Sequence, residues 1–237
     1  MRAAQELLDE YAADCPYAEL AGDFLELTRW TGDDPLLLLA EAAASTTGQR
    51  FATGIRPTVE RFREAFVEAG RVSTYEELAA TDLEDEDLVA AFGAQRKRRV
   101  LLDAAAIFAD RDESDDLAAL QAWAAQADPY RYEADPIGKI SGVGPSTFQY
   151  IRMLAGVDTA KPDPELIQLV EAVAEATDDP SLSPSEPLRA LAACECLAAN
   201  TPYRTIEIDR IAWWQFSDPT QRELTAELEA GREHTPG

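Results

Sequence analysis

The sequence predicts an all-α fold, and three observations carry that prediction. Apolar residues recur at helical spacing in almost every segment, as Val59, Phe62 and Phe66 do in the stretch 57–70. No run of period-two alternation stands between turn signals, so a sheet is not expected. The connectors, such as "TGDDP" and "TDDPSLSP", are short and have the composition of interhelix loops. We therefore expect about a dozen short helices.

The expected helices begin and end at local signals. The helix over 57–70 has Pro57 near its start and Gly70 at its end. In the next helix, Thr74 stands three residues before Glu77, which is the spacing of a capping box. Apolar periodicity predicts further helices over 94–111, 145–155, 166–176, 183–200 and 203–216.

Composition describes a folded and strongly acidic chain. Its 237 residues include 45 Asp and Glu against 21 Lys and Arg, which gives a net charge of -24. The hydrophobic content of 46% excludes a disordered chain. Only three of the basic residues are Lys. Such a surface suits a halophilic cytoplasm, where concentrated salt screens self-repulsion. The alternative is that the acid repels nucleic acid and the protein binds something cationic.

The cysteines favour a reducing compartment. Cys194 and Cys196 stand two apart on a helical stretch and point in different directions, and Cys15 is the third. There is no CxxC pair, and the single His234 stands near the end of the sequence, so we expect no metal site. No apolar run is long enough to cross a membrane, and the first residues lack a signal-peptide core. We expect a soluble, cytoplasmic protein.

The stretch "KISGVGPSTFQYIRMLAGVDTAKPDPEL" contains a tight glycine turn. Gly142 and Gly144 permit positive φ and close approach of another backbone, and Val143 between them can turn inward as an anchor. Ile140 is expected to end a short preceding helix, and Pro145 suits the first turn of the following helix. The turn amides, continued by Ser146 and Thr147, would form an anion site at a helix N-terminus. A glycine-rich interhelix turn without such a role is the simpler interpretation.

A second motif lies downstream of the turn. Asp163 stands in "AKPDPEL", directly before the apolar helix "LIQLVEAVAEA". As an N-cap followed by Pro164 and Glu165, it makes a good helix start that needs no catalytic explanation. Asp158 is a weaker candidate, because it comes too early for that helix.

Basic residues are concentrated near these motifs. The run Arg96, Lys97, Arg98 and Arg99 is the densest in the chain, and it can be a solvated helix end. Lys139, Arg152 and Lys161 flank the turn and Asp163, and together these residues could form a locally positive face for phosphates. The aromatic residues Tyr150, Trp30, Trp213 and Trp214 could stack on bases, although their helical spacing favours core packing.

The Gly-Val-Gly turn, followed after one helix and a loop by an aspartate at a helix start, resembles the helix-hairpin-helix (HhH-GPD) DNA glycosylase superfamily. The segment "LLAEAAASTTGQRFATGIRPTVERFREAF" looks like the early helix pair of that family, and "EIDRIAWWQF" looks like a terminal helix. The resemblance covers about residues 34 to 175. It implies two helical lobes with a cleft between them, one of residues 1–46 plus 158–237 and one of residues 47–157 ending in the hairpin.

The resemblance also implies a function. The expected activity is monofunctional hydrolysis of the N-glycosidic bond of a damaged, flipped base in double-stranded DNA. Asp163 would be the catalytic residue, stabilising positive charge on the deoxyribose or orienting a water. The expected DNA-binding residues are Gly142, Val143, Gly144, Ser146, Thr147, Lys139, Arg96, Lys97, Arg98, Arg99 and Lys161.

The chain departs from the family pattern in three places. Ser146 stands where bifunctional members have a Schiff-base lysine, so no lyase step is expected. Pro164, Glu165 and Leu166 replace the usual Thr-His-Val after Asp163, and no cysteine cluster for an iron–sulfur cofactor follows. No cofactor is expected, and a monovalent cation at the hairpin, which family hairpins often hold, stays open. Two other functions stay open: a DNA-binding relative without catalysis, and an acidic helical scaffold that binds protein.

Overall fold

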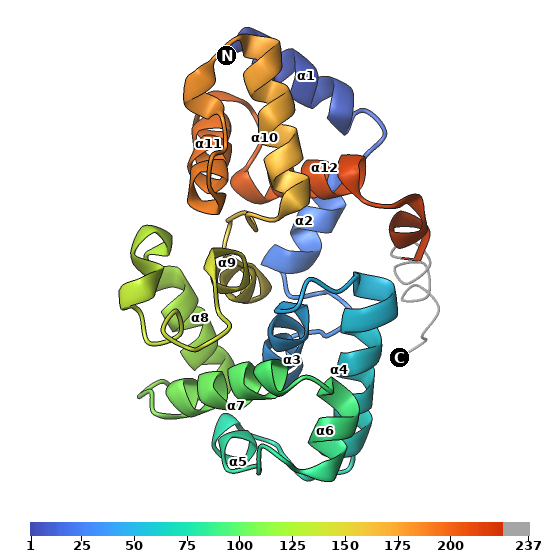
Figure 1. Cartoon of the computed structure of the whole chain (residues 1–237), viewed down its shortest axis with the longest axis vertical. Coiled ribbons are helices and arrows are strands. Elements are labelled where there is room, and N and C mark those ends of the chain that lie inside the picture. Colours follow the sequence, from blue (N-terminus) through green and yellow to red (C-terminus); the bar gives the residue numbers. More distant parts are fainter. Residues whose placement is uncertain (225–237) are drawn as a thin grey trace.

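The computed structural model describes residues 1–224, and within that range the chain forms helices and no strand, which confirms the all-α prediction. His234 and the last part of the segment 158–237 lie outside the described residues. The molecule is elongated, and helices from the two ends of the described chain gather at one end of it (Figure 1). The middle of the sequence forms the other end.

Helices from both ends of the described chain share one hydrophobic core, which we call the terminal cluster. Its buried members include Leu8, Leu20, Leu169, Leu197 and Ile208. The helices that contribute most to it are α1 (Arg2–Ala12), α10 (Pro164–Thr177), η4 (Pro180–Leu182), α11 (Pro187–Asn200) and α12 (Thr205–Phe216).

The middle of the sequence builds a second core, which we call the central cluster. Its buried members include Phe62, Tyr75, Leu101, Phe108 and Phe148. The helices of this part are α2 (Tyr17–Leu25), α3 (Pro35–Ser45), η1 (Phe51–Ile55), α4 (Arg56–Phe62), η2 (Arg63–Glu68), α5 (Tyr75–Ala79), α6 (Glu86–Phe92), α7 (Gln95–Ala109), α8 (Asp116–Gln126), η3 (Pro129–Ala134) and α9 (Pro145–Leu154). Helix α2 contributes to both cores, through Leu20 to the terminal cluster and through Phe24 to the central one.

The two cores do not follow the predicted segments in every part. Residues 36–44 of α3 are buried in the central cluster, although the division expected them to lie with the terminal helices. The segment boundaries at 46 and 158 stay a prediction.

The local helix signals are largely confirmed. Thr74 caps α5, because its hydroxyl accepts from the Glu77 amide at 3.2 Å, whereas the Glu77 carboxylate reaches back to Ser73. The helix predicted over 57–70 begins earlier, at Phe51, because a π-helical turn precedes α4. The short helix predicted to end at Ile140 was wrong: residues 136–141 form turns.

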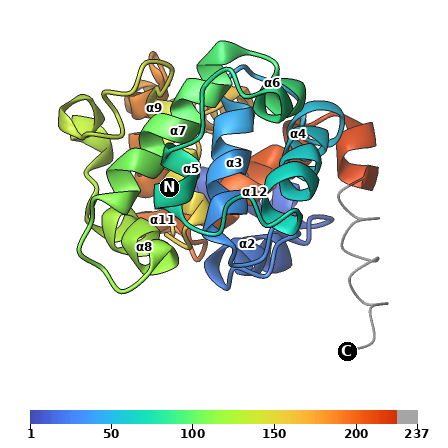
Figure 2. The ribbon, with the colours of Figure 1, turned by 90° about the horizontal axis from the view of Figure 1, so that it is seen from below.

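Helix α3 lies at the centre of the molecule. It is apolar on nearly all sides, and residues 36–44 are all buried. Such a helix must be covered all round. Helices α4, α7, α8 and α9 contact it, and Figure 2 shows α3 between α4 and α7. Asp34 begins it by accepting from the Leu36 and Leu37 amides.

One charged residue lies inside this apolar helix. Glu41 has no exposed surface, and Arg29 donates to both of its carboxylate oxygens, at 2.9 and 2.7 Å. The Tyr150 hydroxyl on α9 donates to the same carboxylate at 2.5 Å. Burial opposes the charged form of Arg29, yet the Glu41 carboxylate beside it raises the pKa of Arg29 above its ordinary value. The network therefore joins the loop after α2 to α3 and α9.

Replacing this carboxylate by an amide tests the network. Glu41→Gln removes the charge that balances buried Arg29, and unpairing a buried charge costs about 3–5 kcal/mol. We expect a fall of that size in the free energy of unfolding, measured with urea. Glu60→Gln is the matched control, because its pair with Arg56 is about one-third exposed and is worth about 0.5 kcal/mol. Equal effects of the two changes would mean that the network is not a structural determinant.

Candidate active site

A cavity of about 650 Å³ opens where the elements of the two cores meet. Its wall includes parts of α2, α9, α10 and α12, the start of α7 and the segment from Ser45 to Phe51. A volume of this size is typical of small-ligand sites. The cavity brings together seven of the residues that the sequence predicted for the site: Arg96, Gly142, Gly144, Ser146, Thr147, Lys161 and Asp163.

The glycine turn forms one side of the cavity. Gly142 has a φ of +111°, a conformation that L side chains rarely adopt, as expected for this turn. Arg96 at the start of α7 donates to the Gly142 carbonyl oxygen at 2.9 Å. Val143 turns inward and is buried in the central cluster. The turn is therefore held from two sides, by Arg96 and by the packing of Val143.

Helix α9 begins at this turn with open amides. The first intrahelical hydrogen bond runs from the Phe148 amide to the Gly144 oxygen at 2.9 Å, so the Ser146 and Thr147 amides precede it. No side chain in the described part of the chain caps this helix at Gly144. Ser146 and Thr147 both line the cavity. A helix N-terminus of this kind attracts anions.

The turn is poorly suited to a cation. The Gly142 oxygen accepts from the Arg96 guanidinium, and the Ile140 oxygen accepts from the Val143 amide at 3.0 Å. Two carbonyl oxygens that could serve as ligands thus have partners already, and one partner is positively charged. A monovalent cation at the hairpin stays a prediction.

Asp163 is the N-cap of α10 and lines the same cavity as the glycine turn. Its Oδ1 accepts from the Leu166 amide at 3.2 Å, as predicted for an N-cap. Its Oδ2 lies 3.6 Å from Lys161 Nζ, and the Lys161 ammonium lies over the ring of Tyr150, 4.5 Å from the centroid. The Asp163 side chain is 18% exposed and lines the cavity.

Helix α12 positions the loop that carries Asp163. The Lys161 amide donates to Asp209 Oδ1 at 2.7 Å, and the Ile206 amide donates to Asp158 Oδ1 at 2.8 Å. Asp158 is therefore a cap for α12. Burial raises the pKa of the Asp209 carboxyl, Arg210 opposes that shift, and Asp163 adds to it.

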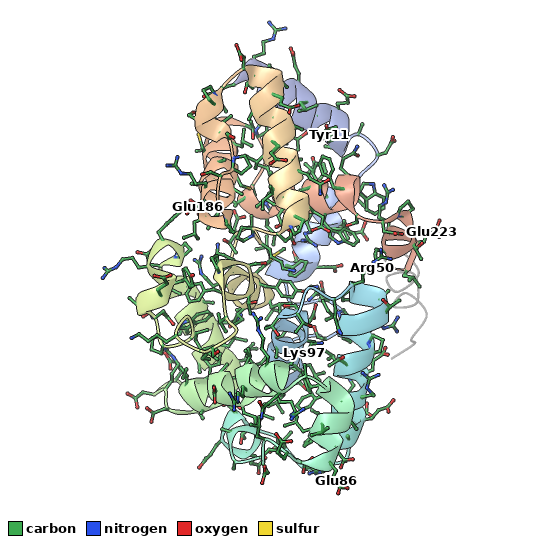
Figure 3. The ribbon with its side chains drawn as sticks, viewed as in Figure 1. Tyr11, Arg50, Glu86, Lys97, Glu186 and Glu223 are labelled. Carbon is green, nitrogen blue, oxygen red and sulfur yellow. The ribbon has the colours of Figure 1, made fainter. Side chains whose placement is uncertain are left out.

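The predicted basic face is only partly at the surface. Lys97 is 2% exposed and donates to Gln49 Oε1 at 2.6 Å, and burial, with Arg61 nearby, lowers its pKa. Arg98 is 4% exposed and bonds to the Leu83 oxygen and to Glu84. Figure 3 shows Lys97 within the ribbon at the level of α3 and α7. Neither side chain is available to a phosphate, which corrects the prediction for these two residues.

The remaining predicted basic residues are placed differently. Arg96, Arg99 and Lys139 are exposed, and of these three only Arg96 lines the cavity. Arg152 is turned inward, where it donates to the Ala124 oxygen and to Gln149.

The charge of the cavity wall differs from that of the whole chain. The wall includes five basic residues, Arg29, Arg50, Arg96, Lys161 and Arg210, against four acidic ones, Asp23, Asp163, Glu165 and Asp218. The whole chain has 45 acidic residues against 21 basic ones. The cavity wall therefore lacks the acidic excess of the whole chain.

No pattern in the sequence pointed to Phe24, Arg29 or Arg210 as residues of the cavity wall. The guanidinium carbons of Arg29 and Arg210 lie 4.1 and 4.9 Å from the centroid of the Phe24 ring. Trp30 and Trp213 also line the cavity. The sequence does contain one sign of the network formed by Arg29, Glu41 and Tyr150. Glu41 interrupts the apolar run "LLLLAEAAA", and a buried acid needs a partner.

Two buried polar atoms beside the cavity lack a partner. Trp30 Nε1 and Ser217 Oγ are buried and form no hydrogen bond within the described part of the chain. Both residues line the cavity. Buried polar groups in proteins are nearly always bonded, so these two atoms are exceptions.

Comparisons with protein-family models, with curated proteins and with solved structures found no match. Between residues 1 and 224, no helix has both the length and the apolar character that crossing a membrane requires.

Substitutions at the two glycines of the turn should differ in their effect on stability. A Cβ at position 142 would lie 2.8 Å from Arg96 Nε, in a conformation that L residues rarely adopt. A Cβ at position 144 would meet no atom within 4 Å. We expect Gly142→Ala to lower the free energy of unfolding by about 1–3 kcal/mol, and Gly144→Ala to change it by less than about 0.5 kcal/mol. Urea titration of both variants measures this, and similar values would contradict the geometry.

Proposed function

We propose that this protein binds double-stranded DNA and hydrolyses the N-glycosidic bond of a damaged base that is flipped into the cavity. The observation that carries the proposal is that one cavity joins the glycine turn, the open start of α9 and the Asp163 carboxylate. These are the features whose order in the sequence resembles the helix-hairpin-helix DNA glycosylases.

DNA would be held mainly by backbone atoms. The Ser146 and Thr147 amides at the start of α9 are suited to a phosphate, and Gly144 leaves room for its close approach. Arg96 adds a positive charge next to the turn. A contact through amides lets an acidic protein bind DNA without a broad basic surface, and the nearly balanced charge of the cavity wall lowers the local repulsion.

The cavity suits an extruded base. Aromatic faces at Phe24, Trp30, Tyr150 and Trp213 line it together with Arg29 and Arg210. Flipped bases are bound by stacking and by hydrogen bonds to their polar edges. Trp30 Nε1 and Ser217 Oγ are unpartnered polar groups next to this space.

Asp163 supplies the negative charge of the proposed reaction. As the bond to the base breaks, positive charge develops on the deoxyribose, and a nearby carboxylate stabilises it or orients the attacking water. The long 3.6 Å contact to Lys161 leaves the charge of Asp163 incompletely neutralised. Ser146 offers no amine, so the product is an abasic site and no lyase step follows.

The same geometry favours a second candidate function, DNA binding without catalysis. Each Asp163 oxygen has a partner within the protein, the Leu166 amide for Oδ1 and Lys161 for Oδ2. A helix cap with an ion pair needs no catalytic role. Base release separates the two candidates.

Binding through the turn is tested at Gly144. Gly144→Val adds a branched side chain at the point of closest approach, where the protein itself has free space, so the fold should persist. Losing one hydrogen bond to a charged phosphate costs about 1.5–3 kcal/mol, or roughly ten- to a hundredfold in affinity for duplex. Fluorescence anisotropy measures the affinity. Gly22→Val on α2 is the matched control, because no atom lies within 4 Å of its Cβ either. Unchanged affinity at Gly144→Val would remove the turn from the binding site.

Catalysis is tested at Asp163. Asp163→Asn keeps an oxygen for the Leu166 amide but removes the negative charge, and such electrostatic contributions are worth about 3 kcal/mol or more. We expect base release to fall at least about a hundredfold. A panel of damaged duplexes in high salt, followed by alkaline cleavage of abasic sites, measures release.

The control for Asp163→Asn is Asp115→Asn, which alters the N-cap of α8, a residue that does not line the cavity. This variant should release bases at the wild-type rate. Wild-type protein that binds DNA but releases no base would favour the second candidate. Protein that does not bind DNA at all would favour a scaffold that binds other proteins.

A further inference from the structure

A second carboxyl group lies beside Asp163 in the cavity. Glu165 is in the first turn of α10, two residues after Asp163, and lines the same cavity. No basic side chain forms an ion pair with Glu165 in residues 1–224, whereas Lys161 is engaged by Asp163 and by the Tyr150 ring. Two carboxyl groups in one cavity repel each other when both are ionised, which favours a proton on one of them.

The surroundings assign that proton to Glu165. Burial, followed by the charge of Asp163, raises the pKa of Glu165, and Lys161 only partly opposes the shift. Asp209 and Arg210 of α12 are the next charged groups, and their charges balance each other in an ion pair. Asp163 has the Leu166 amide and Lys161 to stabilise its charged form. The proton is thus favoured on Glu165, as on the acid of a carboxyl pair that divides acid and base roles.

We propose that Glu165 is the proton donor to the departing base, while Asp163 acts on the sugar. This inference rests on the proposed function and assigns a role to a residue that differs from the family pattern. The bond between C1′ and the base nitrogen breaks with its electron pair going to the base, and the Glu165 proton moves to a ring nitrogen of that base. Water adds its oxygen to C1′ and returns one proton to the carboxylate pair. No oxidant or further reactant is required.

The proposal predicts a difference between two kinds of base. A neutral purine leaves as an anion unless it is protonated, so an acid accelerates its departure. A purine methylated on a ring nitrogen already has a positive charge and leaves as a neutral molecule, so it needs no proton. A proton donor therefore matters for the first kind and is dispensable for the second.

The experiment compares these two substrates in one sequence context. Duplexes contain either hypoxanthine or 7-methylguanine, and single-turnover release is measured for wild type, Glu165→Gln and Asp163→Asn from pH 5 to pH 9. For Glu165→Gln we expect a loss of at least about a hundredfold on hypoxanthine and less than about threefold on 7-methylguanine. Wild-type release of hypoxanthine should fall as the pH rises through the pKa of Glu165, and this fall should vanish in the variant. Asp163→Asn should lose both activities.

The outcomes separate the two proposals. If wild type releases neither base and no other lesion, the proposed function fails, and this inference fails with it. If wild type releases both bases and Glu165→Gln loses them equally, or loses neither, Asp163 keeps its role and Glu165 is not the proton donor. Release of 7-methylguanine alone by wild type would also overturn the donor role. Titration of the carboxyl ¹³C signals, assigned with Glu165→Gln, tests the protonation directly, and a Glu165 pKa in its ordinary range would contradict it.

Discussion

The site depends on how α12 holds the loop between α9 and α10. This loop crosses from the central to the terminal cluster, and two backbone-to-carboxylate hydrogen bonds join it to α12, one at Asp158 and one at Asp209. Asp209 is almost fully buried, and Arg210 next to it holds its other oxygen. Because the Lys161 amide is bonded to Asp209, the position of Asp163 two residues later follows from α12. The residues that shape the site are thus far apart in the sequence.

Burial of charge organises both sides of the cavity. Arg29 and Glu41 form a buried pair behind one wall, and Arg210 and Asp209 form one behind another. Both arginines contact the Phe24 ring. A buried pair costs desolvation energy and adds little net stability, so its value lies in the geometry that it imposes. In this protein the two pairs hold Arg29 and Arg210 in place at the cavity wall.

The sequence predicted the helices better than it predicted the site, for physical reasons. Helix periodicity and caps are local. The cap of α5 at Thr74, and the end near Gly70 of the helical stretch formed by α4 and η2, could therefore be recognised. Lys97 could have been recognised as buried, because it precedes Leu101 by one helical turn on the core stripe. Lys97 therefore lies on the buried face of α7, and not on the exposed face expected for the whole basic run. The contacts of Glu41 with Tyr150 and of Asp209 with Lys161 join residues remote in sequence, which periodicity cannot pair.

A helix cap and a catalytic role for Asp163 are compatible, because its two carboxylate oxygens make different contacts. Oδ1 accepts from the Leu166 amide and orients the side chain, which any N-cap does. Oδ2 lies 3.6 Å from the ammonium of Lys161, a distance longer than a good hydrogen bond. A cationic sugar in the cavity could replace that weak contact without disturbing the cap. The helix start would then preorganise the carboxylate, and the energy of the cap would be the same before and during the reaction. Preorganisation of this kind is what electrostatic catalysis requires, since no reorientation of the charge is needed when the bond breaks.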